Sequence, residues 1–121
     1  NVDGMRVLMD YFSQQHPGAQ LHIVFGTVAD KNPCKVLKLI PENSVMYWCS
    51  ANVVRSMNTD SLQDHGLESG LSGEVYRSVN EAVTAARSAV NSLNLELDQH
   101  AKSIVCGSVY VVGEVVELAK F

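Results

Sequence analysis

The sequence has 121 residues, of which 46% are hydrophobic and 18% are charged. This composition is typical of one globular domain with a single hydrophobic core, and it excludes an intrinsically disordered chain. The formal net charge of -4, without a cluster of Lys and Arg, argues against nucleic acid as a partner. The apolar runs are shorter than the roughly 20 residues that cross a bilayer, so no membrane partner is expected either.

The cysteines and histidines show no spacing that favours a disulfide or a metal site. Cys34, Cys49 and Cys106 are far apart, odd in number and set among apolar residues. We interpret them as reduced core residues of a cytoplasmic protein. The four histidines are interpreted as structural or exposed residues. We therefore predict no metal ligand, and no residue of the chain is assigned a catalytic role.

The chain opens with an amphipathic helix, because Met5, Leu8, Met9 and Phe12 recur at helical spacing. This helix should end by residue 15, before a His-Pro-Gly break. Residues 21–26 then form a mostly apolar run of strand length, whose density indicates burial on both faces of a parallel sheet.

Strand and helix patterns alternate along the rest of the chain. Asn32 is a candidate N-cap for a short helix, and Ser78 with Glu81 matches a capping box before a long one. The further predicted elements are a helix over 33–39, a strand over 44–49, a short helix within 55–73, a strand over 74–76, a helix from 78 or 79 to at least 93, a strand over 103–106 and a helix from 107 or 108 to 118.

This alternation predicts an α/β fold: a Rossmann-like three-layer domain with a mostly parallel sheet flanked by helices. The whole of 1–121 is expected to be a single domain. Since such folds normally begin with a strand, and this chain begins with a helix, we expect a strand of a longer protein to precede it.

Three segments carry motifs that can be compared with a known family. Residues 1–4 read Asn-Val-Asp-Gly, residues 26–31 read Gly-Thr-Val-Ala-Asp-Lys, and residues 107–114 read Gly-Ser-Val-Tyr-Val-Val-Gly-Glu. They resemble, in the same order, the end of an Asp-x-x-His-Asn-x-x-Gly segment, a Gly-x-x-x-Asp-Lys segment and a closing Gly-Ser-Leu-Tyr-Leu-Val-Gly-Glu segment. These belong to the carboxy-terminal domain of folylpolyglutamate and dihydrofolate synthases, in the Mur ligase superfamily.

The resemblance implies an ATP-dependent ligase that adds glutamate to folate or dihydropteroate. In the family, ATP and Mg²⁺ activate the acceptor carboxylate as an acyl phosphate, which the amino group of glutamate attacks. The phosphate-binding loop belongs to the amino-terminal domain, and this chain contains no Gly-x-x-x-x-Gly-Lys-Ser/Thr. We therefore expect an amino-terminal ATP-binding domain as the partner within the same polypeptide, and an inactive fragment without a cofactor of its own.

Polar residues that follow predicted strands are candidates for ligand contact, because ligands of open α/β sheets bind at the carboxyl ends of strands. The candidates for ATP or for an interdomain contact are Asn1, Asp30 and Lys31. Each has a simpler interpretation: Asn1 as a helix cap, and Asp30 with Lys31 as a solvated turn.

The candidates for glutamate binding are Asn52, Arg55, Ser56 and Ser108. An arginine can hold a carboxylate through paired hydrogen bonds, and a serine at a helix amino terminus lies where free amides favour an anion. The segment with Arg55 resembles an Asn-Pro-Arg segment of Mur relatives, although Val53 and Val54 replace its proline context. A surface arginine and an N-cap serine are the simpler interpretations.

Two other functions stay open at this point. A Mur ligase domain of cell-wall synthesis would share the chemistry but act on a nucleotide-linked peptide, and the closing Gly-Ser-x-Tyr motif favours folate over it. A Rossmann-like binding module without catalysis is also compatible with the missing nucleotide loop.

Overall fold

A computed structural model describes residues 1–96 and 100–118 of the chain. The elements are α1 (Val2–Gln15), β1 (Gln20–Gly26), α2 (Cys34–Leu37), β2 (Val45–Trp48), α3 (Thr59–Glu68), β3 (Ser72–Val75), α4 (Val79–Glu96), β4 (Ala101–Gly107) and α5 (Val109–Leu118). The strands and helices alternate as predicted, and most boundaries agree with the sequence patterns within about two residues.

The described strands form a parallel sheet in the order β3-β2-β1-β4. The sequence predicted a mostly parallel sheet, and all four of these strands are parallel. The central strand β1 pairs along its whole length with β4, from Gln20 opposite Ala101 to Gly26 opposite Gly107. The carboxyl ends of β1 and β4 therefore lie next to each other at one edge of the sheet.

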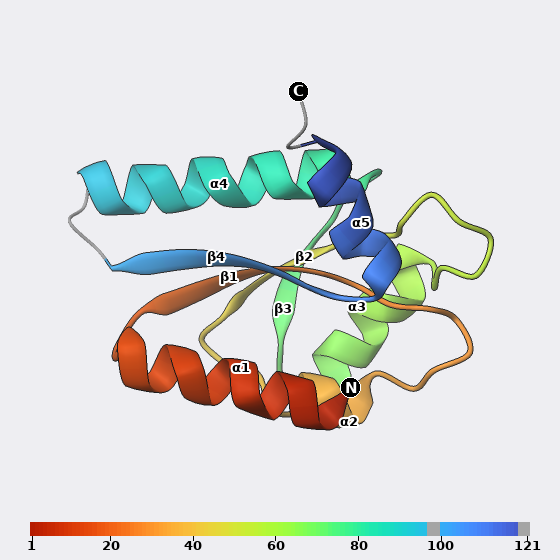
Figure 1. The fold of residues 1–121 in the computed structure, drawn as a ribbon, viewed down its shortest axis with the longest axis horizontal. Helices are drawn as coiled ribbons and strands as arrows, with labels where there is room; N and C mark the ends of the chain where they lie inside the picture. Colours follow the sequence, from red (N-terminus) through yellow and green to blue (C-terminus); the bar gives the residue numbers. More distant parts are fainter. Residues whose placement is uncertain (97–99, 119–121) are drawn as a thin grey trace.

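The sheet is the middle of three layers, with α4 and α5 on one face and α1, α2 and α3 on the other (Figure 1). Alternate residues of β1 reach the two faces, as a strand requires. Ile23 and Phe25 belong to the core that lies under α1, α2 and α3, whereas Val24 belongs to the core under α4 and α5. This arrangement confirms the predicted α/β three-layer fold and the burial of β1 on both faces.

The start of helix α4 and its buried face agree with the sequence pattern. Ser78 Oγ accepts from the backbone N–H of Glu81 at 3.1 Å, as the capping box predicted. The Glu81 carboxylate accepts in return from the N–H of Arg77 at 3.3 Å, one residue before the expected partner. The stripe of small residues on α4 is buried, with Ala82 and Ala86 packed against the sheet.

The segment that begins at Asn32 differs from the prediction. Helix α2 spans only Cys34–Leu37, with Pro33 at the N-cap position, so Pro33 is not its first helical residue and the helix ends before Leu39. The Asn32 side chain still accepts from the N–H of Cys34 at 3.0 Å. Cys49 and Cys106 are buried as predicted, but the core assignment of Cys34 is wrong: it is half-buried where α2 starts.

The third strand and the segment before it differ in detail from the sequence pattern. The polar stretch forms a regular helix, α3, in which Leu62 and Gly66 are buried. The strand β3 begins two residues earlier and ends one residue earlier than predicted, and it is mostly exposed at the sheet edge. Its Gly73 permits close pairing, because a Cβ there would lie 1.8 Å from the Met46 carbonyl oxygen.

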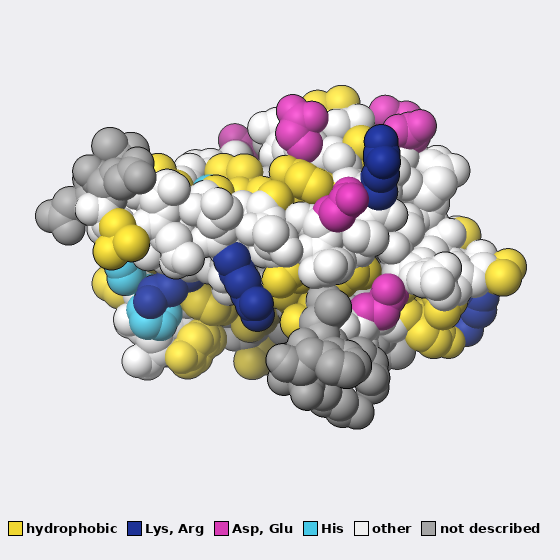
Figure 2. Space-filling view, turned by 90° about the horizontal axis from the view of Figure 1, so that it is seen from above, with side chains coloured by type: hydrophobic (Ala, Val, Ile, Leu, Met, Phe, Trp, Pro, Cys, Tyr) yellow, Lys and Arg dark blue, Asp and Glu magenta, His cyan; other side chains and the backbone are white. Residues whose placement is uncertain are grey.

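The surface over α4 and α5 carries few basic side chains, and those in view lie apart from one another among acidic and hydrophobic ones (Figure 2). On this face the described residues therefore offer no basic stripe for a phosphate backbone. Within the described ranges, no helix has both the length and the apolar character that a membrane crossing would require.

Candidate functional site

The candidate site begins where β1 and β4 end side by side. Gly107 has a φ of +109°, and a Cβ on it would lie 2.0 Å from the carbonyl oxygen of Gly26. Only glycine fits this close approach. The same carbonyl accepts from the N–H of Ser108 at 2.8 Å, so the start of α5 is attached directly to the end of β1.

A cleft of about 540 Å³ opens at this edge of the sheet. It is bordered by the start of α1, the segment after β1, the start of α2, the end of β4 and the start of α5. Its polar lining includes Asn1, Thr27, Lys31, Asn32, Arg55 and Ser108. This position, outside the carboxyl ends of parallel strands, is where open α/β sheets bind ligands.

Four of the seven predicted site residues thus line one cleft, although they are far apart in sequence: Asn1, Lys31, Arg55 and Ser108. Asp30 lies beside it, since its carboxylate is 3.2 Å from the Arg55 guanidinium in a largely exposed ion pair. Such exposed pairs are weak, about 0–1 kcal/mol, so a ligand anion can compete with Asp30 for Arg55.

Two of the cleft residues also do what the simpler interpretations proposed. The Asn1 side chain caps α1 by accepting from the N–H of Gly4 at 2.7 Å. Ser108 Oγ accepts from the N–H of Val111 at 3.3 Å, which is an N-cap contact for α5. Capping engages the single side-chain oxygen of each residue, and both residues still line the cleft.

The other two predicted residues have contacts outside the cleft. The Asn52 backbone N–H donates to the Glu114 carboxylate at 2.9 Å, which attaches the segment after β2 to α5. Ser56 Oγ donates to the carbonyl of Ala51 at 2.8 Å and closes the same segment. Neither residue lines the cleft, and the two contacts hold the loop that carries Arg55.

Sequence reasoning missed Thr27, Asn32, Cys106 and Tyr110, which also line the cleft. Thr27 and Tyr110 fall inside the two longer motifs, so the motifs contained a usable signal for them. Cys106 is no nucleophile, because burial, with Cys49 nearby as a smaller contribution, raises the pKa of its thiol to about 12. The neighbouring Cys49 is held as a thiol in the same way.

The cleft suits an anion. Lys31 and Arg55 supply two cationic groups, and Ser108 and Tyr110 bring the amino-terminal turn of α5, the positive end of its dipole, into the lining. Among the described residues that line the cleft, none is acidic. Because Mg²⁺ prefers carboxylate oxygens, this lining fits a carboxylate or a phosphate better than it fits a metal ion.

The fold and the cleft define a class: a parallel three-layer α/β domain with a cleft at the carboxyl edge of its sheet, lined by two cationic side chains and, among the described residues, by no acidic one. No family model matches the chain, and a search of curated proteins finds no match. Solved structures do match it, and they belong to folate ligases.

Mycobacterium tuberculosis folylpolyglutamate synthase, complexed with ADP and AMPPCP, matches 98% of this chain with a TM-score of 0.84 at 18% identity. E. coli FolC in complex with ADP matches 99% with a TM-score of 0.79 at 20% identity. The bifunctional folylpolyglutamate synthase/dihydrofolate synthase from Yersinia pestis, complexed with AMPPNP and Mn ion, matches 100% with a TM-score of 0.77 at 20% identity.

At these identities the matches establish a shared fold. The chain spans about 27% of the length of each of these three structures. The remaining length of those proteins has no counterpart in this sequence.

Proposed function

We propose that the chain is the carboxy-terminal domain of a folylpolyglutamate or dihydrofolate synthase, an ATP-dependent ligase that adds glutamate to folate or dihydropteroate through an acyl phosphate. The observation that carries the proposal is the match of 98–100% of the chain to structures of such ligases. The three motifs quoted above support it independently, because they were read from the sequence without the fold.

The cleft is the part of this domain that we assign to the reaction. Arg55 and Lys31 bind an anionic group, either a phosphate of the nucleotide or a carboxylate of glutamate, and the amino terminus of α5 at Ser108 adds backbone donors. An acyl phosphate forms and is attacked most readily where water is excluded, so the domain also closes over the reacting groups. In the full-length ligase the amino-terminal domain would hold most of the nucleotide and its Mg²⁺, as in the family that the motifs resemble; the described residues of the cleft lining offer no carboxylate ligand to the metal.

The test is the incorporation of labelled glutamate into dihydropteroate and tetrahydrofolate by the full-length ligase that contains this chain, with ATP and Mg²⁺. Arg55→Ala should lower kcat/KM by about 10- to 100-fold, the value of one charged hydrogen bond of about 1.5–3 kcal/mol. Arg55→Lys should recover part of this loss, because it keeps the charge without the paired donors.

Arg87→Ala is the matched control, since Arg87 is exposed on α4 and outside the cleft lining. An active ligase whose Arg55→Ala variant and a Ser108→Ala variant both behave like the Arg87 variant would keep the family and remove the cleft from the reaction. A ligase inactive on folates but active on a nucleotide-linked peptide would favour the cell-wall enzymes. Activity in the isolated 121-residue chain would contradict its role as a dependent domain.

A further inference from the structure

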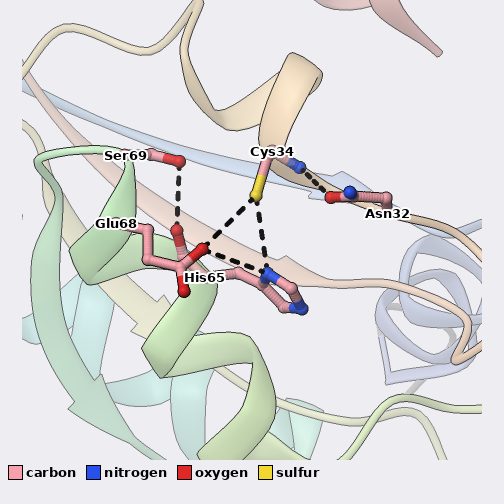
Figure 3. Close-up of polar contacts among 5 residues, drawn as sticks. All are labelled: Asn32, Cys34, His65, Glu68 and Ser69. Carbon is pink, nitrogen blue, oxygen red and sulfur yellow. Dashed lines mark hydrogen bonds and ion pairs between the residues drawn. The ribbon is translucent and has the colours of Figure 1, made fainter.

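A cysteine, a histidine and a glutamate from two helices converge on one point on the α1 side of the sheet. Cys34 Sγ lies 3.4 Å from His65 Nδ1 and 4.0 Å from Glu68 Oε2, and His65 Nδ1 lies 3.9 Å from Glu68 Oε2. Figure 3 shows the three side chains pointing toward one another, with Cys34 at the start of α2 and the other two near the end of α3.

The direction of these contacts distinguishes a metal site from a catalytic triad. In a triad, the nucleophile contacts one histidine nitrogen and the carboxylate holds the other. Here the thiol and the carboxylate both approach the same nitrogen, Nδ1 of His65. The thiol, the imidazole nitrogen and the carboxylate therefore face one shared point, as the ligands of a chelated metal do. A catalytic triad would need the carboxylate at the other nitrogen of His65.

The distances agree with the requirements of zinc. Zn–S bonds of about 2.3 Å and Zn–N or Zn–O bonds of about 2.0–2.1 Å place tetrahedral ligand atoms about 3.3–3.6 Å apart. The Cys34–His65 distance of 3.4 Å is already within this range. Glu68 must move by only a few tenths of an ångström, which its exposed side chain permits.

The fold supports two of the ligands through backbone contacts. His65 and Glu68 are three residues apart on α3, so they share a face of the helix. The Ser69 hydroxyl donates to the His65 carbonyl at 3.0 Å and secures the last turn. The Cys34 N–H donates to the Asn32 side chain at 3.0 Å, which orients the first turn of α2.

We propose that Cys34, His65 and Glu68 form a binding site for Zn²⁺ that joins α2 to α3. A thiolate and an imidazole select zinc and similar borderline metals over Mg²⁺ and Ca²⁺, and three protein ligands leave a fourth position for water. The site is separate from the anion cleft and does not depend on the proposed ligase function. Asn32 lines the cleft and its side chain also accepts from the Cys34 N–H, so the bound metal also stabilises one border of the cleft.

The test is a calorimetric titration of the 121-residue chain with Zn²⁺, followed by an absorption spectrum with Co²⁺ as the probe. We expect one Zn²⁺ per chain, a rise in melting temperature on binding, and a thiolate-to-cobalt charge-transfer band. Cys34→Ser should abolish that band. His65→Gln should lower the affinity for Zn²⁺ by at least about 100-fold, since loss of an outer-shell partner already costs about 10- to 100-fold.

Two substitutions serve as matched controls. Asp64→Asn removes an exposed carboxylate next to His65 in sequence, outside the cluster, and should leave binding unchanged. His16→Gln removes one ring of the pair formed with His100, whose ring centroids are 5.8 Å apart, and tests whether that pair binds the metal instead.

A further test variant is Glu68→Gln. Because Glu68 is exposed, this substitution should weaken Zn²⁺ binding without a risk to folding.

The proposal fails if the chain binds no Zn²⁺ at millimolar concentration, or if binding survives unchanged in folded His65→Gln and Glu68→Gln variants. A cobalt complex without the charge-transfer band would also overturn it, because the thiolate would then not be a ligand. Circular dichroism of each variant separates loss of binding from loss of the fold.

Discussion

His22 shows how far the environment of one residue can determine its chemistry. Its side chain lies between two partners: Nε2 is 3.2 Å from Gln20 Oε1, and Nδ1 is 2.7 Å from the hydroxyl of Tyr47. Because an amide oxygen only accepts, the proton belongs on Nε2, and Nδ1 accepts from Tyr47. Burial lowers the pKa of His22, and burial together with Tyr76 raises the pKa of Tyr47 to about 12. Near pH 7 both groups are therefore neutral in the folded protein.

This environment predicts a pH dependence of stability. The folded-state pKa of His22 lies below the ordinary value of 6.5, so the unfolded chain binds the proton more readily in acid. The contribution of His22 is fully present above about pH 6.5 and is lost as the pH falls from there toward its folded-state pKa. The free energy of unfolding should decrease with a slope of up to about 1.4 kcal/mol per pH unit from this group.

The measurement is urea unfolding from about pH 7 to about pH 5, compared with His22→Asn. Asn keeps an acceptor for the Tyr47 hydroxyl but does not titrate, so the difference between the two curves isolates His22. If both proteins lose stability in parallel over this range, the dependence arises from other groups.

At the scale of elements, the junction between β4 and α5 decides whether the cleft exists. The close approach of Gly107 to Gly26 brings the amino terminus of α5 to the end of β1. On the other side, a Cβ at Gly26 would lie 2.5 Å from the Cys49 carbonyl oxygen. Two glycines on neighbouring strands thus let three segments of backbone meet where the ligand-facing edge begins.

Gly107→Ala should destabilise the protein by at least about 2 kcal/mol, because the side chain meets a backbone carbonyl and the residue holds a positive φ. Gly113→Ala is the matched control within α5, since no atom lies within 4 Å of its added Cβ. It should stabilise the protein by about 0.5–1 kcal/mol through helix propensity. Chemical denaturation of both variants measures the contrast, and equal effects would refute this account of the junction.

On the scale of the whole molecule, both hydrophobic cores depend on the same sheet. Phe25 and Trp48 belong to the core under α1, α2 and α3, and Val24 and Tyr47, on the same two strands, belong to the core under α4 and α5. If the helices on one face of the sheet separate from it, they expose strands that also form the core on the other face. The domain should therefore unfold as one cooperative unit.

The single Trp48, with none of its surface exposed, reports on one core, whereas far-ultraviolet circular dichroism reports on all helices. The two signals should give the same melting temperature. Leu62→Ala removes a fully buried side chain of α3 and should lower the free energy of unfolding by about 2–5 kcal/mol. The melting temperatures from both signals should fall together. A helical transition at a lower temperature than the Trp48 transition would show that the layers unfold separately.

The sequence alone determined the elements whose signals are local. These are the apolar stripe of α1, the capping box before α4 and the dense apolar run of β1. Each depends on residues that are close together in the sequence, so periodicity and capping rules find them. Short or polar elements were placed less well. In α2 and β3 the local preference is weak. Strand β3 forms by pairing with Met46 and Trp48 of β2, and α2 packs against α1 and α3.

The tertiary structure alone decided which side chains meet. Arg55 and Ser108 were predicted from their positions after strands and line the cleft, but the same rule also selected Asn52 and Ser56, which do not line it. Cys34 was assigned to the core, and no spacing rule linked it to His65, 31 positions away. Such contacts depend on how α2 and α3 pack across the same sheet, which is a property of the assembled layers and leaves no periodic trace in the chain.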